Sequence, residues 1–238
     1  MANNIFRMWS SVEPKRVRKD PEARRAEIVA AAAAIALAEG LECVTLRRVA
    51  EELAVRPGLI SHYFAVAEDL VAETFGTAAT AELDELIPAE RPPGRALEYL
   101  ARFLSLTAGE RYDGMSRLWL NARHLSRYRP ILRDRVGDQE ARWRDRLAGL
   151  IAEGAAAGTF RAGDPPAAAV EILVVLDGLG AHANTDRSGR PPAATTMAVS
   201  TAERVLHLPD GAVTALDTWN VVARDGPPLL QGTPRREP

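Results

Sequence analysis

The sequence contains a single cysteine and only two lysines among its 238 residues. One cysteine, Cys43, excludes an internal disulfide and a zinc site built from several cysteines. The lysines are Lys15 and Lys19, so arginine supplies nearly all of the positive charge. The formal net charge of −2 excludes a general electrostatic attraction to nucleic acid. Any DNA binding must therefore come from a local surface.

Aromatic residues are also scarce, at 5% of the chain, and no stretch of about 18 consecutive apolar residues marks a membrane span. The first 20 residues lack the continuous apolar segment of a secretion signal and become basic. We therefore expect a cytoplasmic protein with no membrane partner. With 47% hydrophobic residues the chain can bury a sizeable core, and its abundant alanine favours closely packed helices over a β-sandwich.

Three short helices are predicted near the N-terminus, over residues 20–39, 45–53 and 57–64. The first has Asp20 as a capping side chain, followed by proline at the first helical position. The second and third are joined by a three-residue turn, which is the layout of a helix-turn-helix. A helical hairpin within a bundle is the alternative, but the capping, the turn and the apolar spacing all favour the helix-turn-helix.

Longer helices are predicted in the rest of the chain, separated by breaks rich in proline and glycine. They cover residues 68–86, 94–108, 114–126, 130–157, 165–182 and 193–206, with Gly137 as a possible interruption of the fourth. The predicted fold class is all-α, with about nine helices and no strand. The predicted parts are a basic extension at 1–19, a DNA-binding domain at 20–66, a ligand-binding and dimerisation domain at 67–207, and a tail at 208–238.

The outward face of the third predicted helix suits a DNA major groove. Ile60 and Phe64 share its inner side, toward the second helix. Ser61 and His62 can then reach base edges or phosphates, and Tyr63 can donate its hydroxyl to a phosphate oxygen.

The second predicted helix adds contacts at its start. Thr45 can cap it and touch the DNA backbone, since helix N-termini favour phosphate. Arg47 points outward and carries the planar fork that fits guanine. Together with the third helix this gives the expected DNA-binding residues Thr45, Arg47, Arg48, Pro57, Leu59, Ser61, His62 and Tyr63.

Residues 45–64, with the alanine-rich helix before them, resemble the DNA-binding domain of the TetR family of bacterial regulators. The segment Pro57-Gly58-Leu59-Ile60-Ser61-His62-Tyr63-Phe64 is similar to the BetI-type branch, as are residues 143–154 and 176–179. The resemblance implies an all-helical homodimer, a small-molecule pocket in the C-terminal domain, and a repressor released from a palindromic operator by its ligand. The BetI-type branch suggests choline as that ligand.

By motif position, the resemblance implies base contacts for Arg47, Leu59 and Ser61 and phosphate contacts for Thr45 and Tyr63. The chain departs from the family pattern in two places. Ala67 stands where members usually carry a lysine that contacts phosphate, and Arg56 stands where a serine or threonine cap is common.

Residues 1–70 hold ten basic and ten acidic side chains, so the predicted DNA-binding region is neutral overall. Positive charge collects before and within the first helix, at Lys15, Arg16, Arg18, Lys19, Arg24 and Arg25. This cluster is either a minor-groove or phosphate-binding arm, or a solvated tail or tag.

Aromatic side chains on the long helices are candidates for the ligand pocket, although we expect only two or three to face a cavity. The candidates are Phe75, Tyr99, Phe103, Trp119, His124 and Trp143. Asp177 lies within an otherwise apolar stretch, so it needs a partner or water. The last two helices offer small and apolar residues for a dimer seam: Val170, Leu173, Val174, Gly178, Ala181, Met197, Thr201 and Val205.

An enzyme is the rival class. The sequence has no G-x-S-x-G, no phosphate-binding glycine loop, no H-E-x-x-H and no paired cysteines, so we expect no catalytic residue, no metal and no cofactor. A regulator-like protein that has lost ligand sensing is a further alternative. The favoured interpretation is a transcriptional regulator whose partners are an operator, a small-molecule effector and a second copy of itself.

Overall fold

The computed structural model describes residues 20–109, 112–185 and 192–216, and every regular element within these ranges is helical. The α-helices are α1 (Pro21–Glu39), α2 (Leu46–Glu52), α3 (Pro57–Tyr63), α4 (Ala67–Leu86), α5 (Ala96–Ala108), α6 (Asp113–Ser126), α7 (Pro130–Ala156), α8 (Pro165–Thr185) and α9 (Pro192–Val205). The all-α prediction with about nine helices is therefore confirmed for the described part of the chain.

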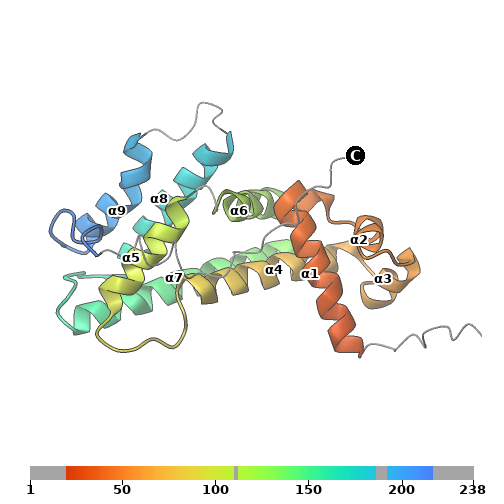
Figure 1. Ribbon diagram of the computed structural model, residues 1–238, viewed down its shortest axis with the longest axis horizontal. Coiled ribbons are helices and arrows are strands. Elements are labelled where there is room, and N and C mark those ends of the chain that lie inside the picture. Colours follow the sequence, from red (N-terminus) through yellow and green to blue (C-terminus); the bar gives the residue numbers. More distant parts are fainter. Residues whose placement is uncertain (1–19, 110–111, 186–191, 217–238) are drawn as a thin grey trace, which may run out of the picture.

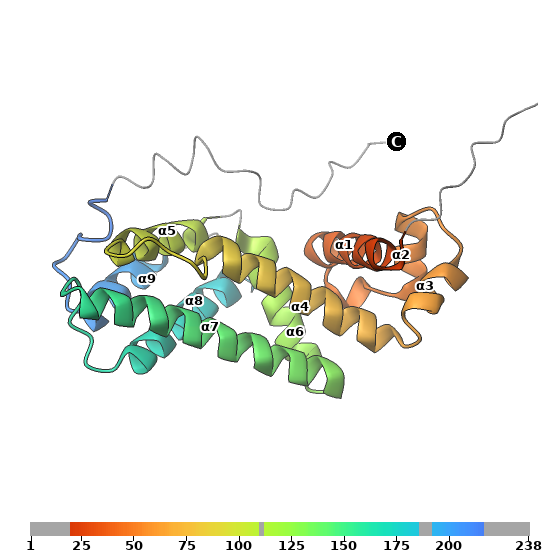
Figure 2. The ribbon, with the colours of Figure 1, turned by 90° about the horizontal axis from the view of Figure 1, so that it is seen from below.

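The helices form an elongated molecule in which α4 and α7 lie side by side along much of the length (Figures 1 and 2). Helices α1, α2 and α3 gather at one end, and α5, α8 and α9 gather at the other. Helix α6 lies between the two ends and contacts both α1 and α8. Two helices, α4 and α6, thus connect the helix-turn-helix end to the rest of the molecule.

Local capping explains why the first helices begin where the sequence predicts. The Asp20 carboxylate accepts hydrogen bonds from the backbone N–H groups of Glu22 and Ala23, at 3.1 and 3.2 Å. The Thr45 hydroxyl accepts one from the N–H of Arg48 at 3.0 Å. Both side chains satisfy donors that have no partner inside the helix.

Three details differ from the expectation. A short 3₁₀ turn at Leu41–Cys43 follows α1, where Gly40 has a φ of +115° and reverses the chain. Helix α7 continues through Gly137, because packing against α4 and α6 holds it in one piece. Helix α8 runs to Thr185, past the predicted end at 182.

Candidate DNA interface and ligand cavity

The turn between α2 and α3 places the two helices as a helix-turn-helix requires. Ala54 adopts a left-handed φ of +51°, and the N–H of Val55 donates to the carbonyl of Ala50 at 2.9 Å. Ile60 and Phe64 are buried at 0% and 1% exposure, so the inner side of α3 is the one that the spacing predicts. The opposite side of α3 is consequently left for a partner.

That outer side carries most of the predicted DNA-binding residues. Thr45, Arg47, Pro57, Ser61 and His62 are exposed, while Leu59, Tyr63 and Arg48 are partly buried. The Ser61 hydroxyl donates to the carbonyl of Pro57 at 3.3 Å, and its oxygen can still accept a hydrogen bond. The rings of His62 and Tyr63 meet edge to face, 5.2 Å between centres.

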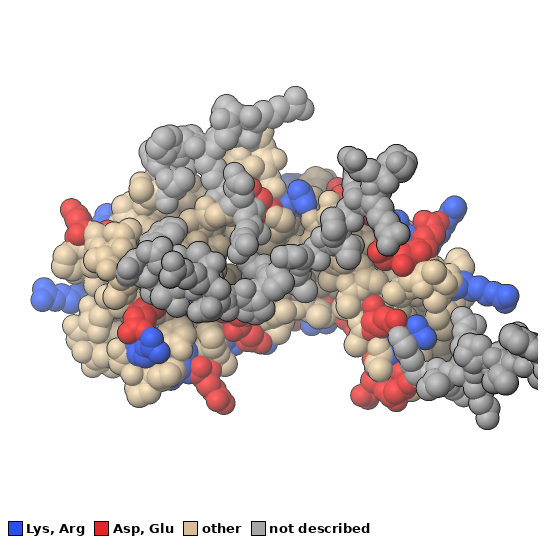
Figure 3. Space-filling model, viewed as in Figure 1, with Lys and Arg blue, Asp and Glu red and all other residues tan. Residues whose placement is uncertain are grey.

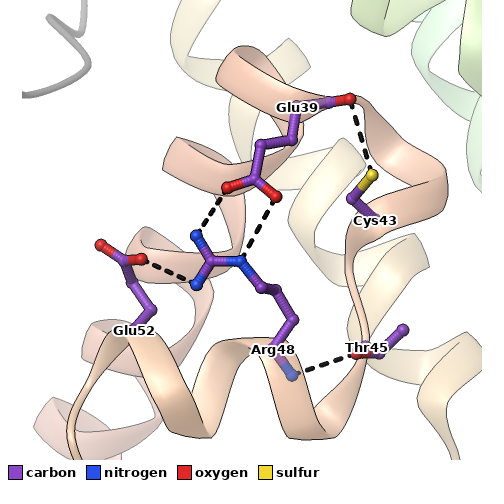
Figure 4. Close-up of polar contacts among 5 residues, drawn as sticks. All are labelled: Glu39, Cys43, Thr45, Arg48 and Glu52. Carbon is purple, nitrogen blue, oxygen red and sulfur yellow. Dashed lines mark hydrogen bonds and ion pairs between the residues drawn. The ribbon is translucent and has the colours of Figure 1, made fainter. Parts of the chain in front are cut away.

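The two arginines of α2 differ in how strongly the protein holds them. The side chain of Arg47 is 84% exposed, and its Nε donates to Glu51 one turn later at 2.9 Å. The guanidinium of Arg48 lies between the carboxylates of Glu39 and Glu52, as Figure 4 shows. The hydrogen bonds that Arg48 donates to Glu39 and Glu52 raise the pKa of Arg48 above its ordinary value. Arg47 is therefore the more available of the two for a base or a phosphate.

Cys43 also lies near this cluster. Its Sγ donates to the backbone carbonyl of Glu39, 3.6 Å away, and the side chain is partly exposed rather than fully buried (Figure 4). The contact follows from the 3₁₀ turn, which folds residue 43 back over the end of α1. The thiol thus serves this corner as a small packed group.

Arg25 links three helices at the base of the helix-turn-helix. Its guanidinium on α1 binds the carboxylate of Glu73 on α4 through two nitrogens, one at 2.9 Å. It also donates to the carbonyl of Tyr63, the last residue of α3, at 3.0 Å. The same group stacks over the Phe64 ring, 4.2 Å from its centre. Two residues of the predicted basic cluster are therefore engaged within the protein, because Arg25 faces α3 and α4 and Arg24 pairs with Glu27. The other four, Lys15, Arg16, Arg18 and Lys19, lie outside the described residues.

Side chains of both charges lie at the helix-turn-helix end on the face that Figure 3 shows. Helix α4 begins at Ala67 with Glu68 and Asp69 in its first turn. The Glu68 carboxylate accepts from the N–H of Ile131 at the start of α7, at 3.0 Å. The acids of this turn thus help to join the helices, and they add no attraction for phosphate.

A cavity of about 240 Å³ opens in the second part of the molecule, among α5, α6, α7 and α8. Its wall is mostly apolar and aromatic, with a few charged groups. The lining includes Phe103, Tyr112, Trp119, Arg123, Trp143 and Asp177. A space of this size fits a small metabolite rather than a peptide.

Arg123 organises the charged side of the cavity. Its guanidinium donates to Asp177 on α8 at 2.8 Å and to Glu140 on α7 at 2.9 Å, and it lies 5.1 Å from the ring centre of Trp119. Asp177 therefore has the partner that its apolar surroundings predict. Burial raises the pKa of Asp177, and Arg123 opposes that shift. No cluster of three or more metal-binding side chains occurs in the described residues.

A second carboxyl group lies behind the cavity wall. Glu82 on α4 is only 5% exposed and accepts hydrogen bonds from the Tyr112 hydroxyl and from Nε1 of Trp119, the latter at 2.8 Å. Burial raises the pKa of Glu82 to about 7, against the lowering effect of these two bonds. The sequence interpretation did not include Glu82, Tyr112 or Arg123.

Three of the six predicted pocket residues line the cavity: Phe103, Trp119 and Trp143. The other three do not. Phe75 is fully buried behind Trp119, with ring centres 4.9 Å apart. Tyr99 packs against the core, and His124 is exposed beside Tyr128.

The predicted dimer seam lies on α8 and α9 at the end of the molecule opposite α3 (Figure 1). Its exposed members are Val170, Val174, Gly178 and Met197, and its partly buried members are Leu173, Ala181 and Val205. Thr201 is 8% exposed, because it packs inside the subunit.

Comparisons with known proteins agree with this architecture. Residues 28–74 match the family described as bacterial regulatory proteins, tetR family. Residues 92–207 match the family described as BetI-type transcriptional repressor, C-terminal. No curated protein is recognisably related to the chain by sequence.

Solved structures share the fold. A TetR-family regulator from Rhodococcus sp. has 23% identity and a TM-score of 0.65, and the match covers 78% of this chain and 99% of that one. A transcriptional regulator from Saccharomonospora viridis, in complex with choline, has the same identity and TM-score over 78% and 97% of the two chains. A TetR regulator from Haloarcula marismortui has 19% identity and a TM-score of 0.61 over 78% and 97%. The chain belongs to the TetR family of DNA-binding transcriptional regulators and carries a BetI-type C-terminal domain.

Proposed function

We propose that this regulator is a repressor that binds a palindromic operator as a homodimer and leaves it when a small molecule fills the cavity. The observation that carries this proposal is the cavity itself, which touches α6 and lies next to α4, the two helices that reach the helix-turn-helix. A ligand that prefers a different spacing of these helices would shift the dimer away from its operator-binding form. The chain would act in the cytoplasm, where bacterial DNA is found.

The cavity wall indicates what such a ligand carries. The indole Nε1 of Trp143 is buried and has no hydrogen-bond partner among the described residues. A buried donor of this kind favours a ligand with an acceptor oxygen. Trp119, Tyr112 and Phe103 supply aromatic faces, and the two carboxylates of the lining, Glu140 and Asp177, are matched by Arg123 and Arg144. These features support a small cation with a hydroxyl or carbonyl group, and choline, which occupies a structural relative, is the first compound to test.

The exposed apolar stripe on α8 supports the homodimer. Val170 and Val174 are 42% and 62% exposed, and Met197 on α9 is 46% exposed. Among the described residues, α8 is the one helix that is also long and apolar enough to cross a membrane. In this fold, a second subunit packing α8 and α9 against the stripe would cover it as a four-helix interface. Val170 and Val174 also border the cavity, so that the partner would cover its mouth.

On the operator, the dimer would place two copies of α3 in successive major grooves, about 34 Å apart. Arg47, Leu59 and Ser61 would face bases, while Thr45 and Tyr63 would face phosphates. Pro57 and His62 lie on the same exposed side and would contact the groove edge. Arg48, held by two carboxylates, would contribute mainly to the shape of α2.

The test pairs ligand binding with operator release. Thermal shifts of the full chain identify stabilising compounds, with choline first and fractions of a metabolite extract after it. Fluorescence anisotropy of a labelled operator then measures release. We expect a stabilising compound to weaken operator binding, and Trp143→Phe, which keeps an aromatic ring but loses the indole N–H, to weaken the compound's effect alone. A compound that binds the cavity and leaves operator affinity unchanged would contradict the proposal.

A further inference from the structure

Glu82 is a buried acid that joins the cavity wall to α4. Both of its hydrogen-bond donors have side chains on the cavity wall: Tyr112 is the N-cap residue of α6, and Trp119 lies in the middle of that helix. Trp119 in turn packs edge to face on Phe75, which lies two turns before Glu82 on α4. Glu82 is therefore the polar part of the contact between α4 and α6 at this level, beside the Phe75–Trp119 ring contact.

The charges around Glu82 leave it without a cation of its own. From α6 it faces Arg123, but that guanidinium is shared between Asp177 on α8 and Glu140 on α7. Asp177 opposes ionisation of Glu82, and Arg123 favours it less strongly than burial opposes it. In the described structure, burial is the largest influence and raises the pKa of Glu82 to about 7. We therefore expect both protonation states of Glu82 to be populated near neutral pH.

Helix α4 carries the DNA-binding module on its other side. Glu73 binds Arg25 of α1, which also holds the carbonyl of Tyr63 at the end of α3. Glu73 and Glu82 are nine residues apart, and at about 100° per residue they lie on opposite faces of α4. A displacement of α4 at Glu82 would therefore reach Arg25 through the same rigid helix.

We propose that Glu82 is a positioning residue whose protonation controls how the cavity wall is attached to α4, so that operator affinity responds to pH through this carboxyl group. The statement about operator affinity rests on the proposed function. The attachment itself follows from the burial of Glu82 and its hydrogen bonds to Tyr112 and Trp119.

The two protonation states make different contacts. A neutral Glu82 accepts from Trp119 Nε1 and can donate its O–H to the Tyr112 oxygen, so no charge is buried and the Tyr112 O–H turns toward the cavity that this residue lines. An ionised Glu82 accepts from both donors but leaves a negative charge in an apolar wall. That charge favours an arrangement that admits water or a ligand cation. Loss of the proton therefore weakens the closed packing of α6 on α4.

The attachment is tested on the full chain without DNA. The indole N–H resonance of Trp119 in ¹⁵N-tryptophan-labelled protein, assigned with Trp119→Phe, is followed from pH 5.5 to 8.5. We expect it to titrate with a midpoint near 7 in the wild type and in Glu85→Gln, a matched change one turn later on α4. It should not titrate in Glu82→Gln. A Trp119 resonance that titrates equally in Glu82→Gln would overturn the proposal.

The operator response is measured as the affinity at pH 6 relative to pH 8 at fixed salt. The DNA face is the same in every variant, so the quantity of interest is the difference in this ratio between wild type and Glu82→Gln. We expect the ratios to differ roughly three- to tenfold, with Glu85→Gln matching the wild type. Identical ratios in wild type and Glu82→Gln would show that operator affinity does not respond to pH through Glu82, and would overturn that part of the proposal. A chain that binds no operator at any pH would instead refute the proposed function, while the Trp119 titration would still decide the attachment.

Discussion

The guanidinium of Arg25 donates to the backbone carbonyl of Tyr63, 3.0 Å away, while it also binds Glu73 and stacks on Phe64. One side chain of α1 thus fixes the end of the recognition helix α3 to the long helix α4. The orientation of α3 relative to the rest of the subunit depends on this contact.

Replacing Arg25 with alanine should therefore loosen α3 without touching its outer face. We expect a loss of about 1–3 kcal/mol in the free energy of unfolding, measured with urea, because a bidentate pair and a carbonyl bond disappear together. Operator affinity should fall at least tenfold. The matched control is Arg24→Ala, which breaks only the Arg24–Glu27 pair and should change stability by less than about 0.5 kcal/mol. Equal effects of the two variants on stability and operator affinity would show that Arg25 does not hold α3 against α4.

The two arginines of α2 should behave differently on DNA. Arg47→Ala should cost about 1–3 kcal/mol of operator binding and relax the preference at one base position, because its exposed fork can reach a base edge. Arg48→Ala should leave base preference unchanged and lower stability instead, since its guanidinium joins Glu39 to Glu52. Binding to a set of single-base operator variants measures both effects. A specificity change in Arg48→Ala, with none in Arg47→Ala, would reverse the assignment.

The raised pKa of Glu82 predicts how stability depends on pH. The folded protein binds this proton with a pKa of about 7, against an ordinary value of 4.5. Between these two values the folded state holds more protons than the unfolded chain, so this contribution to stability falls as pH rises from 4.5 to 7. Glu82→Gln should remove the fall and, in urea unfolding at pH 8, should be more stable than the wild type by about 1–3 kcal/mol. Parallel pH profiles for the two proteins would contradict the assignment.

Charge on the apolar stripe should separate the subunits. Val174→Arg places a cation at a side chain that is 62% exposed in the subunit and that the dimer would bury. We expect monomers in analytical ultracentrifugation and loss of operator binding. Ile131→Arg, at another exposed aliphatic side chain outside the stripe, should remain dimeric. A dimeric Val174→Arg would place the seam elsewhere.

Local chemistry made much of the fold predictable. Asp20 and Thr45 cap helices through their own near neighbours, so their roles follow from a few consecutive residues. Asp177 could be expected to need a partner, because an isolated charge in an apolar stretch is costly. The identity of that partner, Arg123, lies 54 positions away and follows only from the packing of α6 on α8.

The candidate site was harder to predict, because the cavity depends on four helices at once. Aromatic composition identified Phe103, Trp119 and Trp143 but could not separate them from Phe75, which packs behind the wall. Glu82 did carry a signal in the sequence. It falls on the apolar face of α4, after Val71, Phe75 and Ala78, at the spacing of buried positions.

The central claim is that this chain recognises a palindromic DNA site as a dimer. Selection of bound sequences from a random duplex library by the purified full chain tests it most directly. We expect the wild type to enrich an inverted repeat whose half-sites are about one helical turn apart, and Val174→Arg to lose this enrichment. Selection of no defined sequence, or of a single half-site retained by Val174→Arg, would contradict the account.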